Sequence, residues 1–421
     1  MAPPKGGYAP TLDKFLDSLK GRPVNASIES LVSLLKRRQI KGSEACAIAT
    51  AHVLLQVVAR DKWSNVDQLL GRVQLHGKKL VAAQPRELAI GNIVRRVLGL
   101  IRDEAAEDRT DDMGAGLATP PATNLPSSPT RLVRPPTLAS LGSFARTQSM
   151  FNLLSDHDLT HPALSNASTP GLGSGASTPS MNAQSTNVYA LRSEVIDGIE
   201  EIMDEIKQVD EQVQAYSDVV IHPSDYIMVY QPSKTVQRFL TRSKRKFTLF
   251  LVLDPSAAEA ADDPYASLRK SLASNGSLVV TVMNCGLSAY MCRANKVIIG
   301  ARAITARGGV VIDAGAAAIA RTAKAQGRTV VVLGGVYKLS PETSVPHGLV
   351  EWGDPSKYVN FADGAMVSHV KVRSAASEFI PGEFVDTYIT NLGAHTKDNL
   401  HTIVSDHYKE EDINFELYGR K

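Results

Sequence analysis

The chain has 421 residues, which is long enough for two or three domains with at least one sizeable core. Its 46 Lys and Arg residues against 43 Asp and Glu residues give a formal net charge of +3, which argues against a strongly electrostatic nucleic-acid binder. No run of the roughly 18 apolar residues that a membrane span needs is present, and the opening residues MAPPKGGYAP include no apolar signal segment.

The three cysteines are Cys46, Cys285 and Cys292, and they form no CxxC pair. They cannot build a disulfide framework, so we expect a reducing compartment, the cytosol. Because no histidine lies near Cys285 and Cys292, we expect both thiols to be small residues of the core and predict no metal site. No GxGxxG or Walker-A motif follows a predicted strand, and we expect no cofactor.

The first quarter of the chain is typical of amphipathic helices. Apolar residues recur at helical spacing in runs that begin near Ser27, Gly42, Ser64 and Pro85. Ser64, with Asp67 three residues later, resembles a capping box, and Pro85 suits the first turn of a helix. We predict a small helical domain over residues 1–110, where 18 Lys and Arg residues against 11 Asp and Glu residues concentrate the basic character.

The middle of the chain has a different composition. Between Met113 and Asn187, 41 of the 75 residues are Gly, Pro, Ser, Thr or Asn. Such a segment buries too little apolar surface to offset its ordering entropy, so we predict a disordered low-complexity insert over 111–188. Its Ser-Thr-Pro repeats at 168–170 and 177–179 are either phosphorylation sites or parts of a solvated linker.

An apolar seam follows the insert. Steps of four and three residues separate Val195, Ile199, Ile202, Ile206, Val209 and Val213, and acidic residues flank them. About two and a half heptads are too few for a free coiled coil, so we predict a connecting helix over 189–216 that packs on a domain or on a partner. Val195, Ile199 and Ile202 are therefore candidates for a partner surface.

Beyond residue 217, strands alternate with helices. The predicted strands are 226–230, 247–253, 278–283, 296–299 and 329–333, and helices are expected near 233–242, 265–274 and 314–326. Apolar, β-branched strands at this spacing indicate a mostly parallel sheet that is covered on both faces. The predicted fold is an N-terminal helical domain joined by a long helix to a Rossmann-like α/β domain over 217–421.

The crevice of such a sheet lies at the carboxyl ends of its strands. Strand 278–283 ends at Asn284, whose amide cannot transfer a proton at neutral pH, so we predict a crevice with an inactive position at Asn284. Lys338 also follows a strand end. It lines the crevice, lies at an intersubunit surface or caps a turn, and we keep it as a partner-surface candidate.

Several motifs resemble one known family. They are NKVIIGA at 295–301, RGGV at 307–310, ARTAK at 320–324 and VYKLSP at 336–341. The family comprises the alpha, beta and delta subunits of translation initiation factor 2B and the related sugar-phosphate isomerases. In the helical part, WSN at 63–65, LVAAQP at 80–85 and GNIVRRVL at 91–98 are similar to the beta-type members.

This resemblance implies a non-catalytic regulatory role. In the family, alpha, beta and delta subunits form the regulatory core of the guanine-nucleotide exchange factor for initiation factor 2, alongside gamma and epsilon subunits. The core senses phosphorylation of the alpha subunit of initiation factor 2, and the exchange chemistry belongs to epsilon. The resemblance also implies that the position of Asn284 is a proton-transferring Asp in the isomerases.

Two other functions are considered. A sugar-phosphate isomerase would need a carboxylate and a thiol, and Asn284 and the lack of a Cys near Ser233 argue against it. A nucleic-acid-binding module would use basic pairs such as Arg95 and Arg96, but no aromatic residues interleave them for stacking. We expect no direct contact with nucleic acid or membrane, and if Arg95 and Arg96 bind a partner, we expect an acidic protein surface.

Overall fold

The computed structural model describes residues 12–114, 181–254, 263–343, 351–353, 364, 369 and 371–413. The predicted insert over 111–188, with its Ser-Thr-Pro repeats, lies almost entirely outside these residues. Residues Met1–Asp111 and Ala183–Lys421 form one compact unit, and the elements below belong to its described parts. Within the described residues, no helix combines the length and apolar character that a membrane crossing requires.

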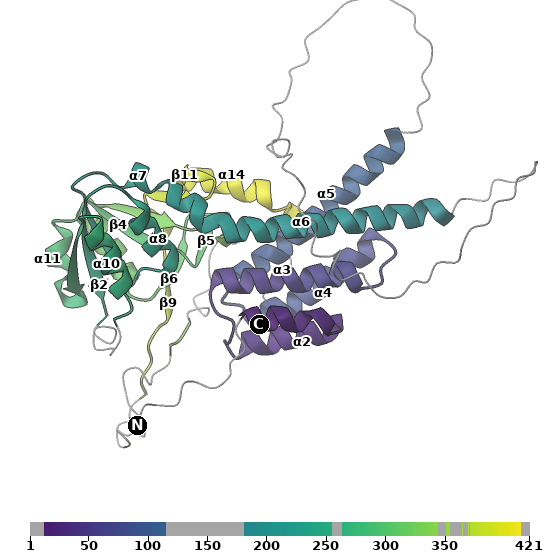
Figure 1. Cartoon of the computed structure of the whole chain (residues 1–421), viewed down its shortest axis with the longest axis horizontal. Helices are drawn as coiled ribbons and strands as arrows, with labels where there is room; N and C mark the ends of the chain where they lie inside the picture. The colour runs from purple at the N-terminus through teal and green to yellow at the C-terminus, as the bar shows by residue number, and fades with distance from the viewer. Residues whose placement is uncertain are drawn as a thin grey trace, which may run out of the picture. The chain divides into compact units, whose positions relative to one another are not determined.

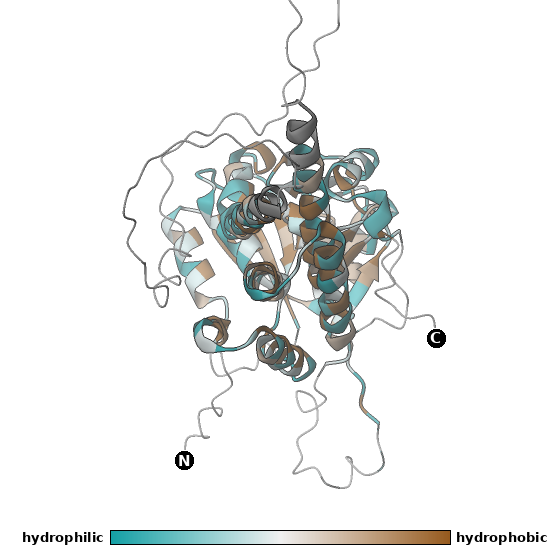
Figure 2. Cartoon of the chain, turned by 90° about the vertical axis from the view of Figure 1, so that its right-hand side faces the viewer, coloured by the Kyte–Doolittle hydropathy of each residue, from teal (hydrophilic) through white to brown (hydrophobic). Residues whose placement is uncertain are grey.

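The first part of this unit is helical, as predicted (Figure 1). Its elements in chain order are α1 (Leu12–Ser18), η1 (Leu19–Gly21), α2 (Val24–Lys36), α3 (Ser43–Arg60), α4 (Val66–Ala83) and α5 (Leu88–Gly114). Viewed nearly end-on, the helices carry hydrophobic residues along one side and hydrophilic residues along the other (Figure 2). The hydrophobic sides meet in one core, which stabilises helices whose propensity alone would not.

The start of α4 differs from the predicted capping box at Ser64 and Asp67. The Asn65 side chain accepts a hydrogen bond from Gln68 N at 2.9 Å, and the Gln68 side chain accepts one from Ser64 N at 3.2 Å. Asn65 is the capping residue because it has extended backbone and an amide oxygen within reach of the first turn. Pro85 precedes α5 by a turn and does not lie in its first turn.

The long helix predicted from the seam is α6 (Met181–Ala215). It runs close to α5: a Cβ added at Gly198 would come within 2.7 Å of the Leu100 side chain. The structure buries the seam in the core of the chain's own helices, together with Val195, Ile199 and Ile202. This corrects the prediction that these three residues line a partner surface, because their side chains are buried against other residues of the same chain.

A seven-stranded sheet forms the centre of the second part, in the order β3-β2-β1-β4-β7-β10-β11. The strands are β1 (Tyr226–Tyr230), β2 (Thr248–Leu253), β3 (Leu278–Met283), β4 (Lys296–Gly300), β7 (Thr329–Leu333), β10 (Thr387–Thr390) and β11 (Gly393–His395). All neighbours are parallel except β10 and β11. The first five match the predicted strands, and the predicted fold class is confirmed.

Helices cover both faces of this sheet. Ile227 and Val229 of β1 belong to the core shared with α6, α8 (Lys234–Arg242) and α10 (Ala266–Ser274). Met228, between them, belongs to a second core with α11 (Leu287–Met291), α12 (Ala316–Ala325) and α14 (Lys397–His407). Successive side chains of a strand point to opposite faces, which is why a continuous apolar run fits here.

A second, four-stranded sheet was not predicted. Its order is β8-β5-β6-β9, with β5 (Ala303–Thr305), β6 (Val310–Asp313), β8 (Leu339–Ser340) and β9 (Ser377–Ile380). Strands of two to four residues are too short for their apolar alternation to stand out in a sequence. This sheet begins directly after β4 and so extends from the carboxyl end of the main sheet.

Long-range hydrogen bonds of Asn92 and Arg102 fasten the helical part to the rest of the unit. The buried Asn92 side chain donates to Tyr337 O at 3.0 Å. Arg102 donates two hydrogen bonds, of 3.3 and 3.2 Å, to the fully buried carboxylate of Asp412, which lies 310 positions later in the sequence. Buried polar groups that are paired in this way hold one arrangement of the two parts.

Candidate functional site

The strand order places a crevice between β1 and β4. From β1 the chain builds β2 and β3 on one side and β4, β7 and β10 on the other, so connections leave β1 and β4 in opposite directions. Ligand crevices of open α/β sheets form at this switch point. Gly300 ends β4 there, and a Cβ added to it would lie 2.6 Å from Ser233 Oγ, the cap of α8. Only glycine allows this close approach.

A cavity of about 510 Å³ opens at this point, between the strand ends and the residues around the start of α3. Its described lining includes five basic side chains, Arg38, Lys41, Lys234, Arg302 and Lys338. It also includes four acidic ones, Glu44, Glu87, Asp313 and Glu351. Charges of both signs therefore line the same cavity, some of them exposed, as Lys41 and Glu44 are, and others partly buried, as Glu87 and Glu351 are.

Arg302 is the centre of this charged lining. Its Nε donates to Asp313 Oδ1 at 2.7 Å and its Nη1 donates to Glu351 Oε2 at 2.9 Å. Glu351 also pairs with Arg38 of the helical part, and Ser43 Oγ, at the start of α3, donates to Arg302 O at 3.0 Å. Burial acts against the charged guanidinium, but the two carboxylates outweigh it and raise the pKa of Arg302.

Two further groups of the crevice have shifted pKa values. Burial raises the pKa of the Glu87 carboxyl to about 7, although Arg302 and Lys338 oppose the shift. Burial lowers the pKa of Lys338, against the pull of nearby carboxylates. The Lys338 ammonium donates to Ala301 O at 2.9 Å, so of the three placements considered for Lys338 the structure shows the crevice.

The thiols are distributed differently from the expectation. Cys285 and Cys292 are exposed, which corrects the prediction that they belong to the core. Cys46 is the buried one; it lies in the crevice lining, and burial raises the pKa of its thiol. The described residues hold no group of three or more His, Cys, Asp or Glu side chains able to bind a metal ion.

Asn284 lies away from the crevice. It follows β3, which is the outermost strand of the sheet, and its side chain is exposed. This corrects the assignment of Asn284 to the crevice. The position that does face the crevice is Arg302, two residues after β4. The signal that could have found it is its place directly after a central strand with a buried Val-Ile-Ile core.

The paired arginines are used inside the chain. Arg95 is 2% exposed and pairs with Glu342 at 3.3 Å, so it offers no surface to a partner, contrary to the prediction. Arg96 pairs with Glu205 of α6 at 2.6 Å, beside a recess of about 470 Å³ between α5, α6 and the end of α14. Both side chains hold α5 in place, and the acidic partner expected for Arg96 is found within the chain.

An apolar patch lies at the opposite ends of the same strands. Tyr226 of β1 is in register with Thr248 of β2, which is in register with Leu278 of β3, so their side chains lie on one face at the amino ends. Leu278 is 61% exposed, and Val280, two residues on, is half-buried. We call Tyr226, Leu278 and Val280 the amino-end patch.

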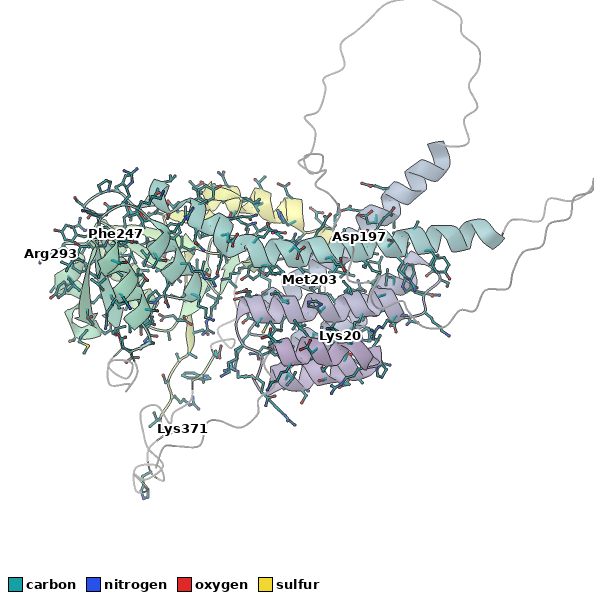
Figure 3. The ribbon with its side chains drawn as sticks, in the orientation of Figure 1. Lys20, Asp197, Met203, Phe247, Arg293 and Lys371 are labelled. Carbon is teal, nitrogen blue, oxygen red and sulfur yellow. The ribbon has the colours of Figure 1, made fainter. Side chains whose placement is uncertain are left out.

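A basic residue borders this patch. The guanidinium of Arg293 lies 6.0 Å from the centre of the Tyr226 ring, and Figure 3 shows Arg293 at the outer end of the α/β part. Side chains of this kind, apolar in the centre with an arginine at the rim, are typical of protein interfaces. Among the described residues, the amino-end patch is therefore a candidate protein interface.

Comparison with known proteins identifies what shares this architecture. The model of the initiation factor 2 subunit family matches residues 39–397. The beta subunit of translation initiation factor eIF2B from Schizosaccharomyces pombe is 32% identical over 397 residues, which cover 92% of this chain and 96% of that protein. The tetrameric eIF2B beta2-delta2 complex from Chaetomium thermophilum contains a chain that is 37% identical, with a TM-score of 0.65, over 95% of this chain and 100% of that one.

A shorter likeness connects the chain to enzymes. Ribose 1,5-bisphosphate isomerase from Pyrococcus furiosus is 33% identical over 126 residues, which cover 30% of this chain and 39% of the isomerase. The likeness to the beta subunits thus runs through the helical and the α/β parts, whereas the likeness to the isomerase covers less than a third of the chain.

Proposed function

Because the chain belongs to the initiation factor 2 subunit family, we propose that it is a beta-type regulatory subunit of the guanine-nucleotide exchange factor for initiation factor 2. It assembles with a delta-type subunit, and with alpha, gamma and epsilon subunits, and it works in the cytosol. Its regulatory core responds to phosphorylation of the alpha subunit of initiation factor 2. In this role the chain binds partners and catalyses no reaction itself.

The observation that carries the proposal is the extent of the match to beta subunits. It spans the helical part, α6 and the α/β part, including the residues around Arg95 and Tyr337 that lock these parts together. The crevice supports this role, since its central side chain is a guanidinium neutralised by two carboxylates and not a proton-transferring group.

The amino-end patch is the surface that we assign to the delta-type subunit. Tyr226 and Leu278 expose aromatic and aliphatic area on a rigid sheet, and such area provides most of the binding energy at protein interfaces. The relative from Chaetomium thermophilum forms a tetramer of beta and delta chains, which is the kind of assembly that an apolar, sheet-borne surface fits.

The test is co-expression of the full chain with a delta-type subunit, followed by mass determination in solution by light scattering. A discrete beta–delta heteromer that binds initiation factor 2 is the expected result. A stable monomer with no affinity for the delta-type subunit would contradict the proposal. The epsilon subunit alone should retain exchange activity. Addition of the beta–delta heteromer should make this exchange activity depend on whether initiation factor 2 is phosphorylated.

An isomerase of the same fold is the alternative, because one thiol and one carboxyl do face the crevice. The Cys46 thiol and the Glu87 carboxyl both line the cavity. Burial raises the pKa of Cys46, which keeps it in the weakly nucleophilic thiol form at neutral pH. We expect no turnover of ribose phosphates; turnover that is lost on Cys46→Ser would establish the alternative instead.

A further inference from the structure

Two guanidiniums converge on one carboxylate in the crevice. Arg302 Nη1 donates to Glu351 Oε2 at 2.9 Å, while Arg38 contacts Glu351 Oε1. Each carboxylate oxygen thus has its own arginine, and the Glu351 side chain is 18% exposed. Arginine forks bind carboxylate and phosphate oxygens with the same geometry, so a pair of them around one anion is the arrangement of an anion-binding site.

Backbone hydrogen bonds connect the segment of Glu351 to the residues that precede β9. Glu351 N donates to Ser377 Oγ at 3.2 Å, Gly353 N donates to Ser374 O at 2.7 Å, and Trp352 forms a bridge with Ala375. This short ladder continues into β9, which pairs with β6. The small sheet therefore delivers the Glu351 carboxylate to the crevice from a segment far along the chain.

We propose that the crevice is an anion-binding site whose anion is the chain's own Glu351 carboxylate. The carboxylate sits where a phosphate group would receive both arginines, and it keeps small phosphate-bearing molecules out. This goes beyond the proposed role as a subunit, because it describes a state of the crevice that holds with or without partners.

The same contact also joins the two parts of the unit. Arg38 lies between α2 and α3 in the helical part, whereas Arg302 and Glu351 belong to the α/β part. In the described lining, five basic residues face four acidic ones, so loss of the Glu351 charge leaves an excess of two positive charges. Electrostatics then favours the uptake of an anion from solution.

The experiment is a calorimetric titration of the full chain with inorganic phosphate at fixed ionic strength. The wild type should show no saturable binding of phosphate. Glu351→Gln, which keeps the size of the side chain, should show saturable binding. Its dissociation constant should be at least about ten-fold below the highest phosphate concentration at which the wild type fails to saturate, the scale of one charge-assisted hydrogen bond. Glu29→Gln is the matched control, since Glu29 pairs with Lys79 on the exposed surface of the helical part. It should behave like the wild type.

Specificity is read from a second substitution. Adding Arg302→Gln to Glu351→Gln should abolish the gained binding, because one of the two guanidiniums is then absent. If Glu351→Gln does not fold, Glu351→Ala is titrated instead, since it also removes the carboxylate from between Arg38 and Arg302. The same gain is expected from it.

Two results would overturn the proposal. One is phosphate binding by the wild type that is as tight as that of the folded variant, because the carboxylate would then not occupy the site. The other is a folded variant that binds no better than the Glu29→Gln control. Neither result depends on assembly with other subunits, so both are distinguishable from a failure of the proposed function.

Discussion

The carboxyl ends and the amino ends of the strands of the main sheet carry different kinds of side chains. At the carboxyl ends of β1 and β4, Arg302 and its neighbours are charged and paired within the chain. At the amino ends of β1 and β3, Tyr226 and Leu278 are apolar and expose area to solvent. A fold of this kind usually works at the carboxyl ends. Here the charged groups at the carboxyl ends are paired within the chain, and we propose that the apolar amino ends bind a partner.

The largest expected effect is on assembly. Leu278→Asp places a charge on the most exposed residue of the amino-end patch, and desolvating that charge in an interface should weaken binding to the delta-type subunit by about 100-fold or more. Affinity is measured by biolayer interferometry on purified subunits. Leu75→Asp is the control, since Leu75 is 54% exposed on α4, away from the sheet. Equal losses for both variants would remove the contrast between the two ends.

The second effect concerns the packing at the carboxyl end of β4. Gly300→Ala puts a methyl group 2.6 Å from Ser233 Oγ, so the cap of α8 or the end of β4 must shift. We expect a loss of about 2 kcal/mol in the free energy of unfolding, measured by urea denaturation. Gly71→Ala on α4 is the matched control, because nothing lies within 4 Å of an added Cβ there. That variant should be as stable as the wild type or more so.

A smaller effect is pH dependence at the crevice. The folded pKa of Glu87 is raised to about 7, above its ordinary value of 4.5, so the folded chain binds this proton more tightly than the unfolded chain does. The associated stability is complete below pH 4.5 and is lost as the pH rises through about 7. As the pH rises from 5 to 8, the free energy of unfolding of Glu87→Gln should therefore increase relative to that of the wild type by on the order of 1 kcal/mol.

The comparison of Glu87→Gln with the wild type is made from urea unfolding at several pH values. A difference between the two proteins that stays constant across this range would show that Glu87 titrates normally. The crevice would then be more solvated than its contacts indicate, and the contrast with the exposed patch would weaken.

The smallest effect is expected at Asn284. Its side chain is exposed beyond the outermost strand, so Asn284→Asp should change the free energy of unfolding by less than about 0.5 kcal/mol. It should also confer no turnover of sugar phosphates in a coupled assay, because the restored carboxylate does not face the crevice. Turnover in this variant would place the reactive end of the sheet at β3 after all.

Sequence patterns predicted five of the seven strands of the main sheet and the long helices, because each of these carries its own apolar pattern, whereas β10, β11 and α14 were not predicted. The strands 226–230 and 278–283 match β1 and β3 residue for residue. The crevice was misplaced because strand order is not encoded locally: nothing within strand 278–283 says that it lies at the edge. Arg302 was missed because its partner Glu351 is far away in the sequence. The small sheet that brings the two together has strands too short to detect from the sequence.

The apolar seam of α6 shows what a correct helix prediction leaves open. Its spacing predicted the helix, but periodicity cannot distinguish burial against the same chain from burial against another. Val195 and Ile199 are completely buried by α6 packing on the helical part. Surfaces for partners could be found only after the internal contacts were known.

The pairing of Arg102 with Asp412 has a consequence for synthesis on the ribosome. Because 310 positions separate the two residues, α5 is translated long before the carboxylate that neutralises its guanidinium. The early helices therefore complete this contact only when the segment around Asp412 has left the exit tunnel. A ribosome stalled before that point would present a nascent chain with unfinished helix packing, a ready client for chaperones.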